Sequence, residues 1–347
     1  MRNTFKPDFR VNTRTLPRRL IFCFDGTWND PSDAYEKGSD VTNIFKTYEA
    51  AVDDDQQKKF YYEGVGTGGE FDKYLGGLTG KGADRIKNEA FIDLVHNFKP
   101  GDRIFITGFS RGAAIARMFA QLIHKEGIPE ELRFTNKKRK FKTKGNVIAR
   151  PKVEMMGIYD TVASFGLPSD IAGIPFQQIN LFKNFDISST TQKVVHLLAV
   201  HEGRNTFKPT LCNHREGVEE IWFPGVHADV GGGYADRGIS DIALDYMLNS
   251  FKDLGVKFQT EKLKEVKPNL TGNIHDKVKE EYALKLVHRE IEVWEKGKTS
   301  SLPPKVHQSV WDRIKRFGEN VPSHVKKVET NFLAVGESPN VSTANMS

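Results

Sequence analysis

A serine stands at the centre of the most informative stretch of this sequence. Ser110 lies between Gly108 and Gly112 in the segment GFSRG, after the apolar run RIFIT and before the helix-compatible run AAIARMFAQLIHK. A G-x-S-x-G pattern between a strand and a helix is typical of a nucleophile elbow, which holds the serine in a strained turn. Backbone N–H groups at a helix N-terminus can stabilise an oxyanion. We therefore predict Ser110 as a nucleophile, with Gly108, Arg111 and Gly112 supporting the turn and the oxyanion.

Two other interpretations of this turn are open. A strand-to-helix turn can need small residues for packing and for nothing more. The same helix N-terminus could bind phosphate, although the lysine and the spacing of a P-loop are missing. The G-x-S-x-G pattern also arises by chance, but rarely at the end of an apolar strand and the start of a helix.

A nucleophilic serine needs a general base, which in this kind of fold follows the last strand of the sheet. His227 lies in such a place, after the apolar run at residues 220–223 and before three successive glycines at residues 231–233. The glycines allow the loop to fold back over the strand ends. We therefore predict His227 as the base, and the alternative is an ordinary packed or surface histidine.

The acid that orients this histidine has three candidates. Asp160 ends the run EMMGIYD, at a strand edge where the sites of α/β proteins assemble. Glu202 ends the next run, and Asp229 follows the histidine by two positions. An acid at 160 or 202 could instead cap a helix or pair with Arg204. We take Asp160 as the predicted partner of His227 and keep the other two as alternatives.

The second half of an oxyanion hole is expected after an earlier central strand. The apolar run at residues 20–24 is followed by Asp25, Gly26 and Thr27, and a Gly-Thr turn there could direct N–H groups at the site. Asp25 would oppose a neighbouring oxyanion unless it is hydrogen-bonded or protonated. We therefore expect Asp25 to hold the loop by accepting backbone N–H bonds.

Apolar runs alternate with helix-compatible stretches along the chain. Continuously apolar runs are typical of strands buried on both faces, and their alternation with helices favours a parallel sheet. The predicted fold is of the α/β-hydrolase type, with a mostly parallel, doubly wound central sheet and helices on both faces. Strands are predicted at residues 20–24, 60–62, 103–107, 154–159, 194–200 and 220–223, and helices at 41–51, 83–98, 112–125 and 240–254.

The chain of 347 residues can hold one large α/β domain or two smaller ones. We expect an N-terminal arm at residues 1–17, a hydrolase domain at 18–336 and a flexible tail at 337–347.

Two segments interrupt the alternation of strands and helices. Residues 130–151 are basic and polar and are predicted to form an exposed insertion or loop. Residues 167–192 mix Pro, Gly and Phe and are interpreted as a lid, a substrate-facing loop or an irregular packed connection. After residue 240 we expect mostly helix and loop.

Composition narrows the class of protein. Hydrophobic residues make up 38% and charged residues 28%, which is typical of a globular chain. The net charge of +6 is concentrated in runs at residues 133–144 and 252–267, without a nucleic-acid motif, so we expect no nucleic-acid partner. Cys23 and Cys212 have no metal-ligand spacing, so neither a disulfide framework nor a metal site is predicted.

Targeting signals are also missing from the sequence. No run approaches the ~18 apolar residues that a membrane-spanning helix requires, and the first residues lack the apolar segment of a signal peptide. We expect synthesis in the cytoplasm, and any export would use a dedicated secretion system that needs no signal peptide.

Four blocks of the sequence resemble the α/β-hydrolase domain family typified by the type VI secretion phospholipase effectors. The resemblance implies a Ser-Asp-His triad in chain order, at Ser110, Asp160 and His227, and an esterase or phospholipase that needs no cofactor. The block at residues 201–207 departs from the family, because an acidic pair followed by Arg is usual there and only Glu202 is present. The four blocks are FDGTWN at 24–29, GFSRGAAIAR at 108–117, DTV at 160–162 with Gly166, and WFPGVHADVGGGY at 222–234.

The sequence leads to two hypotheses about function. The first is a serine hydrolase that cleaves carboxylic esters through an acyl-enzyme, with a lipid, a phospholipid or a small-molecule ester as its substrate. The second is a non-catalytic binding or regulatory module, because a fold alone does not guarantee chemistry. Basic residues could bring either protein to an anionic membrane, at roughly 1 kcal/mol each, and the resemblance leaves room for an immunity or secretion partner.

Overall fold

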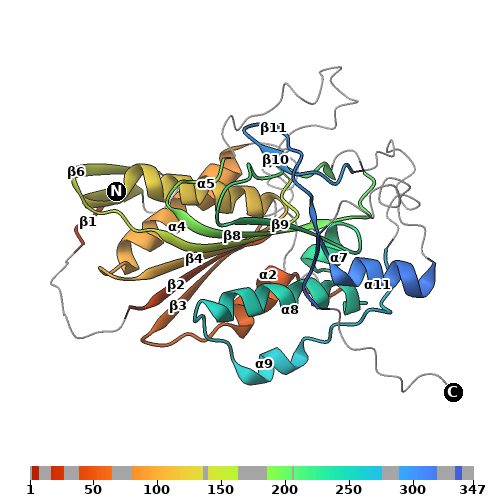
Figure 1. Ribbon diagram of the computed structural model, residues 1–347. Coiled ribbons are helices and arrows are strands. Elements are labelled where there is room, and N and C mark those ends of the chain that lie inside the picture. The colour runs from red at the N-terminus through yellow and green to blue at the C-terminus, as the bar shows by residue number, and fades with distance from the viewer. Residues whose placement is uncertain are drawn as a thin grey trace.

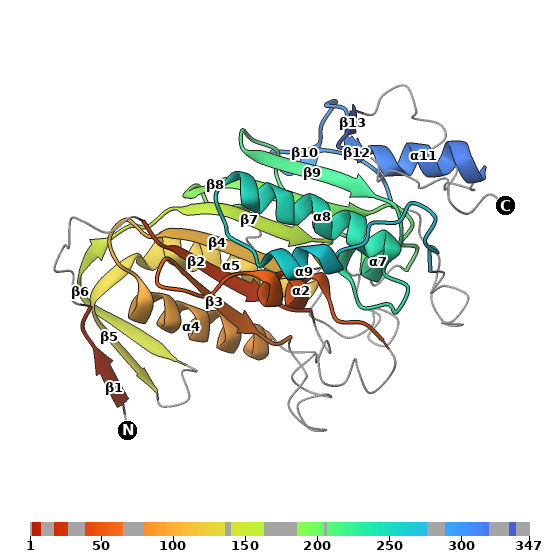
Figure 2. The same ribbon diagram turned by 90° about the horizontal axis from the view of Figure 1, so that it is seen from below.

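Eight strands form one sheet in the part of the chain that the computed structural model describes. They are β2 (Arg19–Phe24), β3 (Gln57–Tyr62), β4 (Arg103–Phe109), β7 (Val153–Tyr159), β8 (Thr191–Ala199), β9 (Val218–Phe223), β12 (Lys305–His307) and β13 (Leu333–Val335). In the order β13-β12-β9-β8-β7-β4-β2-β3, every neighbouring pair is parallel (Figures 1 and 2). The described residues are 2–7, 17–26, 39–64, 80–135, 140–162, 186–204, 207–275, 289–318 and 333–337.

Helices cover both faces of this sheet, as Figures 1 and 2 show. The main ones are α2 (Asn43–Ala50), α4 (Gly80–Asn97), α5 (Arg111–Glu126) and α8 (Gly238–Asp253). Helices α4 and α5 lie on one face, and α2 and α8 lie on the other. The predicted α/β class, with a mostly parallel sheet between two helical layers, is therefore confirmed.

Strand β2 illustrates why the predicted strands are apolar throughout. Successive side chains of a strand point to opposite faces of the sheet. Leu20, Phe22 and Phe24 pack in the cluster beneath α4 and α5, whereas Ile21 and Cys23 pack in the cluster beneath α2 and α8. Because both faces are covered, neither set of positions tolerates a polar residue.

A second, three-stranded sheet occupies the segment near residues 130–151. Strands β5 (Ile128–Thr135) and β6 (Phe141–Ala149) form an antiparallel pair, and β1 (Arg2–Phe5) pairs with the other edge of β5. Most of β6 is exposed, as expected. Part of the expected N-terminal arm is thus a strand of this sheet.

The prediction of a loop at this segment was wrong. A few apolar side chains among its many charged residues pack against α4, and they hold the segment as a hairpin. Leu132 is buried, and the ring of Phe141 stacks on Phe91 of α4 with centroids 4.8 Å apart. Phe134 meets His96 of the same helix edge to face. The lysines face outward from a hairpin that α4 anchors.

The C-terminal part of the chain extends the sheet beyond β9, the last strand that the sequence predicts. The expectation of helix and loop after residue 240 missed β12 and β13, because strands of three residues are too short to show a period.

Residues 163–185 and 338–347, which include most of the second interruption and the tail, lie outside the described residues. Also described are α7 (His227–Gly231), α9 (Thr260–Glu265), β10 (Trp294–Glu295), β11 (Lys298–Thr299) and α11 (Gln308–Phe317). None of the described helices has the length and hydropathy to cross a membrane.

Candidate active site

Ser110 occupies the turn between β4 and α5. Its backbone has φ 57° and ψ −123°, a conformation that residues with a side chain seldom adopt. The Ser110 N–H donates to the Tyr159 carbonyl at 3.0 Å, and the Ser110 carbonyl accepts from the Val162 N–H at 3.3 Å. These two bonds fix the strained turn against the end of β7.

The glycines on either side of Ser110 have no room for a side chain. A Cβ on Gly112 would overlap the carbonyl oxygens of Phe24 and Asp25, at the end of β2. A Cβ on Gly108 would lie 2.7 Å from the carbonyl oxygen of Gly112. The first turn of α5 therefore packs directly on the strand backbone, as the GFSRG pattern indicated.

Arg111 is the first residue of α5. Its backbone N–H belongs to the first turn, where N–H groups point out of the helix rather than to an acceptor within it. Burial lowers the pKa of the Arg111 side chain to about 10, which still leaves it cationic at neutral pH. The positive end of the helix dipole thus lies beside the serine.

His227 begins the short helix α7 after β9. Its Nδ1 lies 2.6 Å from Oδ2 of Asp160. The imidazole contacts two rings, with centroids 4.6 Å from Phe109 and 4.9 Å from Phe207. Because Phe109 immediately precedes Ser110 in the chain, the histidine is held beside the serine turn.

The electrostatics of this pair fix the tautomer of His227. Burial lowers the pKa of His227, and the neighbouring Asp160 opposes this only in part, so the ring is neutral at neutral pH. An ionised carboxylate can only accept hydrogen bonds. Nδ1 therefore carries the proton that Asp160 accepts, and Nε2 keeps its lone pair.

Asp160 is completely buried at the end of β7, with φ 39°. Its Oδ1 accepts from the Ala199 N–H at 3.1 Å, and Arg289 donates to Oδ1 at 2.6 Å and to Oδ2 at 2.9 Å. Burial alone would raise the pKa of Asp160. The charge of Arg289 and the hydrogen bonds from His227 and Arg289 outweigh that effect, so the pKa stays well below its usual range.

Glu202, the first alternative acid, contacts the backbone of His227. Its Oε2 accepts the His227 N–H at 3.2 Å. Its carboxylate also accepts from Nε of Arg204 at 2.9 Å and from Nη2 at 2.8 Å, which is the pairing considered from the sequence. Glu202 thus fixes where the histidine begins its helix.

Asp229, the second alternative acid, belongs to a separate pair. It accepts the N–H of Val226 at 2.9 Å and lies 2.6 Å from Nδ1 of His275, whose ring stacks on Tyr234. Among the described residues, Asp160 is the carboxylate that hydrogen-bonds the ring of His227. Asp229 instead caps α7.

The turn after β2 is closed by Asp25. Its Oδ1 accepts the Gly26 N–H at 2.6 Å, and its Oδ2 accepts from the hydroxyls of Thr42 at 2.6 Å and Tyr61 at 2.7 Å. Asp25 therefore holds this loop, as expected. The Gly26 N–H departs from its expected oxyanion role because the adjacent carboxylate engages it, and Thr27 lies outside the described residues.

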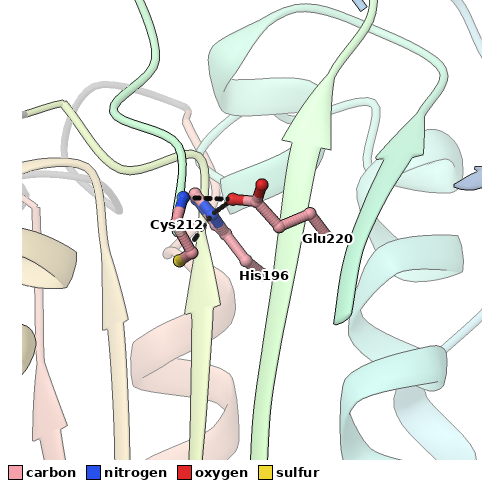
Figure 3. Close-up of side chains that lie close together, drawn as sticks. All are labelled: His196, Cys212 and Glu220. Atoms are coloured by element: carbon pink, nitrogen blue, oxygen red, sulfur yellow. Dashed lines mark hydrogen bonds and ion pairs between the residues drawn. The ribbon is translucent and has the colours of Figure 1, made fainter. Parts of the chain in front are cut away.

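The sequence did not indicate a polar cluster of His196, Cys212 and Glu220, which contacts Thr161, the residue after Asp160. Figure 3 shows the three side chains. His196 of β8 places Nδ1 2.7 Å from Oε1 of Glu220 on β9, and its Nε2 lies 3.1 Å from the Thr161 N–H. A backbone N–H can only donate, so Nε2 accepts and Nδ1 donates to the carboxylate. The cluster thereby anchors the residue that follows Asp160.

Cys212 completes this cluster, and the three side chains have the types of metal ligands. Its N–H donates to Glu220 at 2.7 Å, and its Sγ lies 3.7 Å from Nδ1 of His196. Burial raises the pKa of Cys212, which disfavours the thiolate that a metal requires. A metal bound to Nδ1 would require the proton of the neutral imidazole to lie on Nε2. Nε2 could then no longer accept the hydrogen bond from the Thr161 N–H. The contacts fit a structural network better than a metal centre.

Arg289 is the other site residue that sequence reasoning missed. It lies far along the chain from every motif, and no local pattern marks it. Only the folded chain brings its guanidinium to Asp160, 129 positions earlier.

Comparison with known proteins finds similar sequences. The family profile described as "T6SS, Phospholipase effector Tle1-like, catalytic domain" matches residues 18–143 and 129–250. A curated relative, "Uncharacterized protein YEL023C" of Saccharomyces cerevisiae, is 26% identical over a region that covers 56% of this chain and 32% of that protein.

A solved structure shares the fold. The crystal structure of an uncharacterized protein from Pseudomonas aeruginosa is 20% identical with a TM-score of 0.54, covering 73% of this chain and 49% of that one. The structure of the Tle1 effector bound to the VgrG spike from the Type 6 secretion system is 24% identical with a TM-score of 0.39, covering 64% and 52%. The chain thus spans about half of each structure, and 32% of the curated relative.

Proposed function

Since the chain belongs to the family of Tle1-like phospholipase effector catalytic domains, we propose that it is a serine hydrolase that cleaves carboxylic esters of lipids or phospholipids. Ser110 is the nucleophile, His227 the general base and Asp160 the acid that orients it. The observation that carries the proposal is the 2.6 Å contact between His227 Nδ1 and buried Asp160, beside a serine in a strained strand-to-helix turn.

The proposed reaction proceeds through an acyl-enzyme. Ser110 Oγ attacks the ester carbonyl carbon while Nε2 of His227 takes the hydroxyl proton. The tetrahedral intermediate then expels the alcohol, which receives that proton from His227. Water repeats the sequence on the acyl-enzyme, releasing the carboxylic acid and restoring Ser110. The Arg111 N–H is the proposed oxyanion donor at the start of α5.

We expect a fluorophosphonate probe to label the folded protein at Ser110, because such probes trap a serine that a neighbouring base activates. Intact-mass and peptide-mass measurements would locate the adduct. Ser110→Ala should remain unlabelled.

Ser309→Ala is a matched control, because Ser309 lies within hydrogen-bonding distance of a histidine, with Oγ 2.7 Å from Nδ1 of His307, but does not lie in an elbow. That variant should label as the wild type does. An unlabelled, correctly folded wild type would remove the hydrolase proposal and favour a non-catalytic module.

The pH dependence of kcat/KM should report the base. His227 must be neutral to accept a proton, and burial lowers its pKa. The neutral form therefore persists at lower pH than for an ordinary histidine, whose pKa is about 6.5. We expect the acidic limb of the profile, measured with a soluble ester, to lie below that value. A limb above it would contradict the assignment of His227 as the base.

A further inference from the structure

Arg289 makes an arrangement of contacts that the reaction scheme above does not use. Its side chain is 3% exposed. Nη1 donates to Asp160 Oδ1 at 2.6 Å and to the Ala199 carbonyl at 2.9 Å. Nη2 donates to Asp160 Oδ2 at 2.9 Å and to the Phe207 carbonyl at 2.5 Å. Each terminal nitrogen thus spans one carboxylate oxygen and one backbone carbonyl.

This pattern depends on the shape of a guanidinium. Two parallel N–H···O bonds to a carboxylate require a planar fork, and an ammonium cannot reproduce them. The fork ties the ends of β7 and β8 to the loop that carries Phe207. Because the Phe207 ring packs against His227, Arg289 holds both the acid and one wall of the imidazole.

We propose that Arg289 is a positioning residue of the catalytic site, which locks the Asp160 carboxylate against His227 and, by its charge, disfavours the imidazolium. This inference rests on the proposed hydrolase function. Arg289 lies beyond residue 250, where the family match ends. The C-terminal part of the chain therefore completes the site instead of only extending the sheet.

The charges around His227 determine in which direction its pKa should change when Arg289 is replaced. Asp160 and Glu202 are anions that favour the imidazolium, and Arg289 is the cation that opposes it. Glu202 is itself paired with Arg204, and Asp229 with His275. When the positive charge of Arg289 is removed, the negative charge of Asp160 is less compensated and stabilises the imidazolium more strongly. The pKa of His227 should therefore rise.

The test uses three variants of the full chain. Arg289→Gln removes the charge, whereas Arg289→Lys keeps a charge but loses the fork. Arg313→Gln is the matched control, because Arg313 is also a buried arginine of the C-terminal part, and it donates to the carbonyls of Leu270 and Gly272.

The pKa of His227 would be read by nuclear magnetic resonance of protein labelled with nitrogen-15 in histidine, with the resonance assigned by its loss in His227→Gln. We expect Arg289→Gln to raise that pKa by about one unit, the size of shift that a nearby charge commonly produces. Arg289→Lys should shift it much less but lower kcat, and Arg313→Gln should change neither.

The acidic limb of kcat/KM should move upward with the titration in Arg289→Gln. An unchanged or lowered His227 pKa in that variant would overturn the proposal, since a merely structural role would displace Asp160 and weaken the imidazolium. If Arg289→Gln does not fold, Arg289→Lys decides, because an unaltered kcat in that variant would reject the positioning role of Arg289. A wild type that hydrolyses no ester would reject the proposed function, yet the titration could still be read without substrate.

Discussion

Ser110→Ala is expected to lower ester turnover by at least about a thousandfold with the fold preserved, and His227→Ala should do the same. The first variant removes the attacking oxygen, and the second removes the group that accepts its proton. The Ser110 side chain makes no capping bond to α5, so its loss should not unwind the helix. Steady-state kinetics with a soluble ester would measure kcat, and circular dichroism would check the fold.

The two losses should not add. Each group is useless without the other, so the double variant should be about as slow as the slower single variant. A double variant much slower than either single one would show that the two residues act independently. His227→Ala also removes the ring that contacts Phe109 and Phe207, so the unfolding midpoint of this variant must be measured beside its rate.

Six strands of the central sheet, all except β12 and β13, could be predicted because burial within the sheet leaves a strong apolar signal in the sequence. Phe22 packs against the helices on one face of the sheet, and Cys23 packs against those on the other. Both positions are therefore apolar, and the continuous apolar run stands out in the sequence. The β5–β6 hairpin gave no such signal. Its apolar contacts, for example Phe141 on Phe91, are few and lie among lysines, so charge dominated the pattern.

The parts of the candidate site were predictable to different degrees. The Ser110 turn is encoded locally, since Gly108 and Gly112 are demanded by backbone packing within a few residues. Arg289 is encoded nowhere near its partner. A buried arginine is specified by the carboxylate and carbonyls it meets, and here these come from three distant segments. No periodicity or motif can indicate such a contact.

Asp160→Asn should lower turnover by roughly ten-thousandfold, the loss known for the corresponding change in a serine protease. The surroundings of Asp160 fix how the amide would lie. Each carboxylate oxygen accepts two hydrogen bonds, Oδ1 from the Ala199 N–H and Nη1 of Arg289, and Oδ2 from Nδ1 of His227 and Nη2 of Arg289. Of these four donors only the imidazole can become an acceptor by changing its tautomer, so the amide oxygen should take the Oδ1 position. The NH2 group would then face Nδ1 of His227, which would have to accept and so shift its proton to Nε2. In that tautomer the imidazole cannot take the proton of Ser110.

Glu202→Gln is the matched control for this change, because Glu202 touches only the backbone N–H of His227 among the described contacts between the two residues. Gln keeps an oxygen for that N–H and leaves the tautomer of the ring unaffected, so its kcat should fall much less. Measuring kcat of both variants on the same ester, together with the Nδ1 proton resonance of His227, separates the two acids. A larger loss in Glu202→Gln than in Asp160→Asn would assign the orienting role to Glu202, even though Ser110 and His227 would keep theirs.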